Sequence, residues 1–218
     1  MTAPAVTCLF VDIGGVLLTD GWDHHARRRA MKTFGLAWTE IEPRHQLMFA
    51  SYEEGKLTLE DYLGRVIFAK KRSFTRTQFR RFMFAQSQPY PAMIDLIARL
   101  RARYALKVIA VSNEARELNA HRIQTFGLGR IIDAFVSSCF VHVRKPDVDM
   151  FRIALDIAQA PARNVLYLEN TAMFVQIAEG LGIRSILHTD YVSTSARLAS
   201  LGLDLAVPKA RIEQRSST

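Results

Sequence analysis

The run Val6-Thr7-Cys8-Leu9-Phe10-Val11-Asp12-Ile13-Gly14-Gly15-Val16 joins an apolar segment to a single carboxylate and a pair of glycines. A short apolar segment that ends at turn residues is typical of a strand buried on both faces of a parallel sheet. Four further segments of this form lie downstream, at 107–111, 134–136, 165–168 and 184–187. Together with 6–11 they predict five buried strands.

Segments with the helical spacing of apolar residues separate these strands after residue 90. They cover 92–103, 114–126, 148–158 and 172–181, and two of them end near Gly127 and Gly182. Asp147 is placed to cap the helix that begins at Val148. Because strands that alternate with helices form right-handed crossovers, we predict an α/β fold: a Rossmann-like parallel sheet core with helices on both faces.

Residues 20–88 contain no convincing strand and read as an all-helical insertion. Four helical patterns lie near 24–34, 39–51, 58–71 and 75–85. Thr58 stands at the start of one, and Thr75 with Gln78 has the form of a capping box at the start of another. The predicted division is a core of 1–19 and 89–208, a helical lobe of 20–88, and a polar tail of 209–218.

Composition describes an ordinary globular protein, with 49% hydrophobic and 23% charged residues among 218. The two cysteines, Cys8 and Cys139, form neither a disulfide framework nor a metal-binding pattern, which favours a reducing compartment. The N-terminus lacks a basic leader, and Asp12 interrupts its apolar stretch, so we expect no signal peptide and no membrane span. These features predict a cytoplasmic location.

The net charge of +8 and the pI near 9.8 raise the question of nucleic-acid binding. The basic clusters are short, and no zinc knuckle, aromatic RNA-binding signature or long basic arm accompanies them. Solvated helix faces explain them better, and a small anionic substrate would also suit this charge. We therefore expect no nucleic-acid partner, and the sequence does not indicate an oligomeric state.

Polar residues follow three of the predicted strands. In parallel sheets, ligands bind beyond the carboxyl ends of the strands, which is where these residues would lie. Asp12 follows the first strand, Ser112-Asn113 the second and Glu169-Asn170 the fourth, while Lys145 precedes a helix. Each of them singly suits a turn, a helix cap or a surface charge. Together they supply two carboxylates, a hydroxyl and an ammonium, which can hold a divalent cation and a phosphoryl group while a carboxylate attacks phosphorus.

The order and spacing of these residues across 6–188 resemble the four motifs of the haloacid dehalogenase-like hydrolase superfamily. Leu9 to Leu17 matches the first motif except at its second Asp, which is Gly14 here. Ser112 matches the second motif and Lys145-Pro146 the third, while Glu169-Asn170 keeps only the first acid of the fourth. The helical stretch after the first motif looks like the small cap that closes over the substrate in this family.

This resemblance implies a magnesium-dependent phosphatase that acts on a small phosphorylated metabolite. Asp12 would be the nucleophile and form an aspartyl intermediate, and Lys145 would neutralise the nucleophile and the transition state. Ser112 and Asn113 would bind the substrate's transferring oxygens at the start of the following helix.

The same resemblance implies a magnesium site. Asp12 and Glu169 would hold the ion, together with the backbone carbonyl of Gly14 and the side-chain oxygen of Asn170. Asn170 carries one negative charge fewer than the acid usual in the family, which would weaken the hold on the ion.

Gly14 stands where the family has its general acid and base. Because proton transfer by a placed group is worth about a hundredfold to ten-thousandfold, a phosphatase without it should be slow, restricted to good leaving groups, or supplied by another residue. The nearest candidates are Asp20, Asp23, His24 and His25.

Two alternatives remain open. A 2-haloacid dehalogenase releases halide without a proton, which suits Gly14, but Val16 and the sequence after Glu169 differ from that branch. A catalytically weak or inactive relative could use the same fold to bind a ligand or partner. Substrate specificity is expected on the cap, with plausible contacts at Arg27, Arg28, Arg44, His45, Tyr52 and Lys56.

Overall fold

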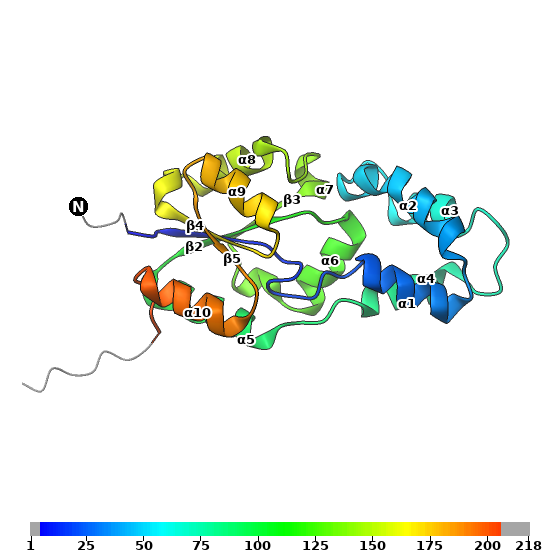
Figure 1. The fold of residues 1–218 in the computed structure, drawn as a ribbon, viewed down its shortest axis with the longest axis horizontal. Helices are drawn as coiled ribbons and strands as arrows, with labels where there is room; N and C mark the ends of the chain where they lie inside the picture. The colour runs from blue at the N-terminus through cyan, green and yellow to red at the C-terminus, as the bar shows by residue number, and fades with distance from the viewer. Residues whose placement is uncertain (1–4, 206–218) are drawn as a thin grey trace, which may run out of the picture.

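The computed structural model describes residues 5–205 and contains one five-stranded parallel sheet beside a helical lobe (Figure 1). The strands lie in the order β3-β2-β1-β4-β5. Their bounds are β1 Cys8–Val11, β2 Lys107–Ser112, β3 Ala134–Ser137, β4 Val165–Glu169 and β5 Arg184–Leu187. The predicted fold class and all five predicted strands are confirmed, with β1 at the centre.

The register of the sheet places the predicted polar residues at one edge. Val11 of β1 pairs with Ala110 of β2 on one side and with Leu168 of β4 on the other. Asp12 extends this register, since its N–H donates to the Leu168 carbonyl at 2.9 Å. The carboxyl ends of β1, β2 and β4 therefore meet at the same edge of the sheet.

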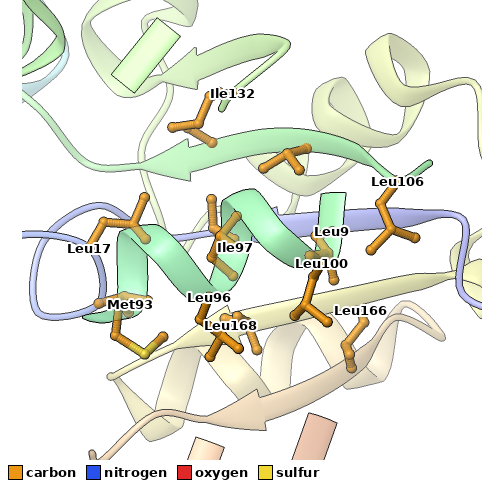
Figure 2. Packing of buried hydrophobic residues seen from close by; sticks show 14 of the residues in the cluster. Leu9, Leu17, Met93, Leu96, Ile97, Leu100, Leu106, Ile132, Leu166 and Leu168 are labelled. Atoms are coloured by element: carbon orange, nitrogen blue, oxygen red, sulfur yellow. The ribbon is translucent and has the colours of Figure 1, made fainter. Parts of the chain in front are cut away.

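Helices cover both faces of the sheet, as predicted (Figure 1). On one face lie α5 Pro91–Tyr104 and α10 Tyr191–Ser200, and on the other α8 Val148–Ala158 and α9 Ala172–Gly180. Successive strand residues point to opposite faces, so Leu9 packs against α5 (Figure 2) while Phe10 packs toward α8. This two-sided burial explains why the strands read as continuous apolar runs.

The helical lobe inserted after β1 is the cap that the sequence predicts. It contains α1 His24–Phe34, α2 Trp38–Glu53, α3 Leu59–Val66 and α4 Arg76–Ala85, which enclose an aromatic core of their own. Thr58 and Thr75 each begin a helix with a complete capping box, and Asp147 caps α8. These three predicted helix starts are confirmed.

The structure differs from the sequence prediction mainly in helix lengths. Helix α3 ends at Val66 rather than near residue 71, because the chain turns there and Arg72 donates from Nε to the Ile67 carbonyl at 2.7 Å. Helix α10 was not predicted. Its β-branched and Ser-rich start has weak helix propensity, which the Asp190 cap and the burial of Leu198 offset.

Four further elements complete the core: α6 Arg116–Thr125, the short α7 Ser138–Val141, and two single 3₁₀ turns at Leu128–Arg130 and Ala162–Asn164. Both cysteines are buried free thiols. Between residues 5 and 205, the longest and most apolar helices still fall short of what a membrane crossing requires. The predicted polar tail, 209–218, lies outside the described residues.

Candidate active site

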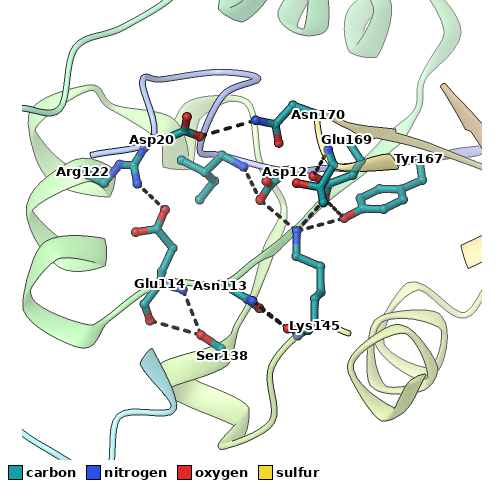
Figure 3. A network of polar contacts seen from close by, with 12 residues as sticks. Asp12, Asp20, Asn113, Glu114, Arg122, Ser138, Lys145, Tyr167, Glu169 and Asn170 are labelled. Atoms are coloured by element: carbon teal, nitrogen blue, oxygen red, sulfur yellow. Dashed lines mark hydrogen bonds and ion pairs between the residues drawn. The ribbon is translucent and has the colours of Figure 1, made fainter. Parts of the chain in front are cut away.

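The predicted site residues converge where the cap faces the carboxyl edge of the sheet (Figure 3). A cavity of about 450 Å³ opens there, and both lobes contribute to its wall. The predicted residues that line it are Asp12, Gly14, Ser112, Asn113, Lys145 and Asn170. Glu169 is fully buried and lies behind Lys145 rather than on the cavity surface.

A charged network is centred on the ammonium of Lys145, a residue that is only 1% exposed. Its Nζ lies 2.6 Å from Glu169 Oε2 and 3.2 Å from Asp12 Oδ1, and it donates to the Tyr167 hydroxyl at 3.0 Å. Burial alone would lower the pKa of Lys145, but the charges of Asp12 and Glu169 raise it above the ordinary value. The ammonium therefore stays charged beside the cavity.

Glu169 is held on both carboxylate oxygens. The Tyr167 hydroxyl donates a short hydrogen bond to Oε2, and the Thr171 N–H donates to Oε1 at 2.9 Å. Burial raises the pKa of Tyr167 well above its ordinary value, so this hydroxyl remains a neutral donor. Glu169 and Tyr167 thus fix the position of Lys145 from behind.

Asp12 presents its carboxylate to the cavity from the end of β1. Its Oδ1 accepts the N–H of Ile13 at 2.9 Å and faces Lys145. Among the described residues, the hydrogen bond and the ion pair of this side chain both involve Oδ1, so Oδ2 is left without such a partner in a residue that lines the cavity. This is the arrangement that an attacking carboxylate needs.

Asn113 and Ser112 follow β2 at the same edge. The Asn113 amide donates to the Lys145 carbonyl at 2.9 Å and accepts the Lys145 N–H at 2.8 Å, so it ties the loop that carries the ammonium to the sheet. Ser112 is 2% exposed and borders the cavity next to it. The predicted contact of these two residues with a substrate remains a prediction.

Gly14 lies against Asp20, which the sequence offered as one of four replacements for the missing acid. A Cβ at position 14 would stand 3.4 Å from Asp20 Oδ1, so the Asp20 carboxylate adjoins the space that a side chain at 14 would enter. The Asn170 amide donates to the same oxygen at 3.5 Å. Partial burial, together with the charges of Asp23 and Asp12, raises the pKa of Asp20.

The other three candidates have different surroundings. Asp23 caps α1 and accepts the Ala26 N–H at 2.6 Å. His24 accepts from the Arg28 guanidinium at 2.9 Å, and His25 is exposed. Asp20 is therefore the candidate that the fold brings next to Gly14.

Three residues that matter to the site were not predicted from the sequence. Tyr167 stands two positions before Glu169 on β4, so the period of a strand places both on one face, and that spacing could have indicated the pair. Glu114 and Arg122 form a buried ion pair at 2.5 Å in the cavity wall. Arg122 also donates to the Thr19 carbonyl at 2.6 Å, which links the wall to the start of the cap.

The cap candidates for specificity divide into two groups. Arg27, His45 and Tyr52 line the cavity. The other three contact groups elsewhere: Arg28 lies over the Trp38 ring, Arg44 donates to the Arg65 carbonyl, and Lys56 pairs with Glu54.

The oxygen donors at the cavity fit a magnesium ion. In the part of the chain that the structure describes, no three His, Cys, Asp or Glu side chains meet in a metal-binding group. Asp12, Gly14 and Asn170, which carry a carboxylate, a backbone carbonyl and a side-chain amide, nevertheless line one cavity. Magnesium is commonly held by one or two carboxylates with water and substrate phosphate, so a set with a single free carboxylate remains suitable.

Comparison with known proteins establishes the family. The haloacid dehalogenase-like hydrolase model matches residues 6–203, and the chain belongs to this family. The predicted superfamily is thereby confirmed. Drimenol cyclase of Aspergillus calidoustus is 24% identical over 198 residues, which cover 84% of this chain and 34% of the cyclase. The chain thus spans about a third of the length of that relative.

Solved structures share the fold. A haloacid dehalogenase family enzyme of Bacteroides thetaiotaomicron, in complex with magnesium and inorganic phosphate, superposes with a TM-score of 0.73 at 17% identity, over 87% of this chain and 99% of that one. The L-2-haloacid dehalogenase of Xanthobacter autotrophicus with covalently bound chloropropionic acid superposes with a TM-score of 0.60 at 18% identity, over 89% of this chain and 83% of that one.

Proposed function

We propose that this hydrolase is a magnesium-dependent phosphatase of a small phosphorylated metabolite in the cytoplasm, acting through an aspartyl-phosphate on Asp12. The observation that carries the proposal is the pairing of a cavity-facing carboxylate with the buried Lys145 ammonium at 3.2 Å. The magnesium and phosphate bound by the Bacteroides thetaiotaomicron enzyme lend support.

In the proposed reaction an oxygen of Asp12 attacks phosphorus, an oxygen–phosphorus bond forms, and the bond to the leaving alcohol breaks. Lys145 neutralises the charge that gathers on the phosphoryl oxygens, and its fixed position avoids reorganisation during the step. Ser112, with Asn113 beside it, borders the place where those oxygens would lie. Water then attacks phosphorus, releases phosphate and restores the Asp12 carboxylate.

Asp12, the Gly14 carbonyl and Asn170 would hold magnesium in this site. When bound, the ion neutralises charge on the phosphoryl group. Glu169, whose two oxygens accept from Lys145, Tyr167 and Thr171, would act from behind Lys145 unless it exchanges a partner.

We assign the missing proton transfer to Asp20. Its carboxyl borders the cavity beside Gly14, and its raised pKa favours the protonated form that a leaving alkoxide needs. Asp20→Asn should slow hydrolysis of an alkyl phosphate about a hundredfold or more but that of p-nitrophenyl phosphate far less, because nitrophenolate leaves without a proton. Equal loss on both substrates would contradict this role.

Two other functions remain as alternatives. A 2-haloacid dehalogenase is favoured by Gly14 and by the fold likeness to the Xanthobacter autotrophicus enzyme, since halide needs no proton to leave. A binding protein is favoured by the loss of two acids from the family motifs, at Gly14 and Asn170.

The deciding experiment measures hydrolysis of p-nitrophenyl phosphate and a panel of sugar and nucleotide phosphates, with and without magnesium, beside Asp12→Asn. We expect magnesium-dependent turnover that falls at least about a thousandfold in the variant. Turnover that survives Asp12→Asn would indicate a contaminant. Absence of turnover in both proteins would favour the binding protein, and 2-haloacids would be assayed next.

A further inference from the structure

The cations that line the cavity are all neutralised within the described part of the chain. Arg27 pairs with Glu42 at 2.9 Å, Arg122 with Glu114 at 2.5 Å, and Arg144 with Glu53 at 2.8 Å. Lys145 is shared by two carboxylates at the reaction centre. Among the described residues, the positive charge of the chain is therefore not concentrated on the cavity wall.

The buried histidine of the cavity wall, His45, adds no positive charge at neutral pH. Burial, with the nearby Arg27, lowers the pKa of His45 to about 4. Asp23, in contrast, borders the cavity without a salt bridge to a cation in the described residues. Among these groups, a second anion beyond the phosphoryl site would therefore meet an unpaired carboxylate and no unpaired arginine.

One face of α2 forms the roof of this space. His45, Gln46, Phe49, Tyr52 and Glu53 all line the cavity, and their spacing places them along one side of the helix. They offer a leaving group an amide, aromatic surface and a carboxylate. This surface suits hydroxyl groups and apolar carbon rather than an anion.

The Glu53–Arg144 pair closes the roof onto the core. Arg144 contacts Glu53 Oε2 through Nε at 3.0 Å and Nη2 at 2.8 Å, and its guanidinium lies 4.9 Å from the centre of the Phe49 ring. Arg144 directly precedes Lys145, so this cap contact sits beside the reaction centre. The Ser138 hydroxyl, which donates to the Glu53 carbonyl at 2.7 Å, fixes the same turn of α2.

We propose that the Glu53–Arg144 pair makes this site select phosphate monoesters whose leaving group carries no negative charge, such as a small uncharged or cationic polyol. This inference rests on the proposed phosphatase function. Glu53 cancels Arg144, which would otherwise attract a second anionic group, and Asp23 repels such a group. Phosphorylated carboxylic acids, bisphosphates and nucleotides are therefore poor substrates.

The test compares glycerol 3-phosphate with 3-phosphoglycerate, which are close in size and differ in one carboxylate. We expect kcat/KM to favour glycerol 3-phosphate by at least about tenfold. Glu53→Gln should reduce this preference about tenfold, mainly through a lower KM for 3-phosphoglycerate. The matched control is Asp95→Asn, which removes an equal charge from an exposed position of α5 and should leave the preference unchanged. Equal kcat/KM for the two substrates in the wild type would overturn the proposal.

Binding separates failure of this inference from failure of the proposed function. Calorimetry with Asp12→Asn measures the affinity for both compounds without turnover. We expect glycerol 3-phosphate to bind more tightly than 3-phosphoglycerate. If no phosphate is hydrolysed by the wild type, the proposed function fails, yet equal affinities would still overturn the selectivity. A Glu53→Gln protein that folds, by its circular dichroism and melting curve, but keeps the full preference would also overturn it.

The pH dependence of the preference provides a second readout. Burial raises the pKa of Glu53 to about 7, against the opposing charge of Arg144. The charged groups that face Glu53 are Arg144, Glu114 and Lys145. As pH falls from 8 to 6, Glu53 should gain a proton, Arg144 should become available, and 3-phosphoglycerate should improve relative to glycerol 3-phosphate. Glu53→Gln should remove this trend, and a preference that stays constant with pH in the wild type would contradict it.

Discussion

The core and the cap each contain a buried polar centre built around a tyrosine hydroxyl, but one centre is charged and the other neutral. In the core, Tyr167 joins Lys145 and Glu169. In the cap, the Tyr62 hydroxyl accepts from Trp22 Nε1 at 2.9 Å and contacts His45 Nδ1 at 2.7 Å. Tyr62 and Tyr167 are both fully buried.

The difference shows where this fold keeps its chemistry. Buried charges cost free energy of desolvation that pairing only partly offsets, so a charged centre suits a site that uses the charge. The cap centre avoids this cost, because burial and Arg27 lower the pKa of His45 to about 4 and keep its ring neutral at pH 7. We therefore expect the core centre to govern turnover and the cap centre to govern the stability of the lobe that covers it.

The largest effect is expected for Lys145→Met. The substitution removes the ammonium that Asp12 and Glu169 share, so turnover should vanish and the free energy of unfolding should fall by about 3–5 kcal/mol. Urea denaturation and phosphatase assays measure the two effects. The control is Lys145→Met combined with Glu169→Leu, which also removes a stranded carboxylate and should regain part of the stability. Equal stability of the single and double variants would mean that the unpaired Glu169 carboxylate does not account for the loss of stability in Lys145→Met.

The next largest effect is a loss of stability at acidic pH, which we expect to arise from His45 in the cap. His45 has an ordinary pKa of 6.5 and a folded pKa of about 4, so its contribution to stability is present above pH 6.5 and is lost as pH falls toward 4. The loss amounts to at most about 3 kcal/mol, from 1.36 kcal/mol per pKa unit. Lys145 has a raised pKa, so its contribution is lost only as pH rises beyond its ordinary value of 10.5.

Melting curves of the wild type and His45→Gln between pH 4 and 7 isolate this contribution. The pKa of Glu53 is raised to about 7, so its protonation increases the stability of the folded protein as pH falls over part of this range. The quantity to measure is therefore the difference in stability between the wild type and His45→Gln at each pH. The gap between their stabilities should narrow as pH falls from 6.5 to 4. A constant gap would show that the cap centre does not depend on a neutral His45.

The sequence could predict the two carboxylates that face Lys145 because they stand at the ends of strands, whereas it did not predict Tyr167. Asp12 and Glu169 end apolar runs, and parallel strands bring such residues to one edge. It could not predict the contacts between lobes, since Glu53–Arg144 depends on how α2 docks against the loop before α8. The proximity of Asp20 to Gly14 depends likewise on the turn that follows β1. The end of α3 was missed for a similar reason, because Arg72 stabilises the turn at Ile67 from outside the helix.

The smallest effects come from removing each tyrosine hydroxyl. Tyr62→Phe leaves the Trp22 N–H and the His45 ring without their partner, so we expect a loss of about 1–2 kcal/mol of unfolding free energy and little change in kcat. Tyr167→Phe removes hydrogen bonds to charged groups and should cost a similar free energy, but it should also lower kcat, since Lys145 loses a contact that orients it. Measuring both quantities on both variants tests the division directly. If Tyr62→Phe reduced kcat as much as Tyr167→Phe, the neutral centre of the cap would take part in turnover, and the contrast between the two centres would fail.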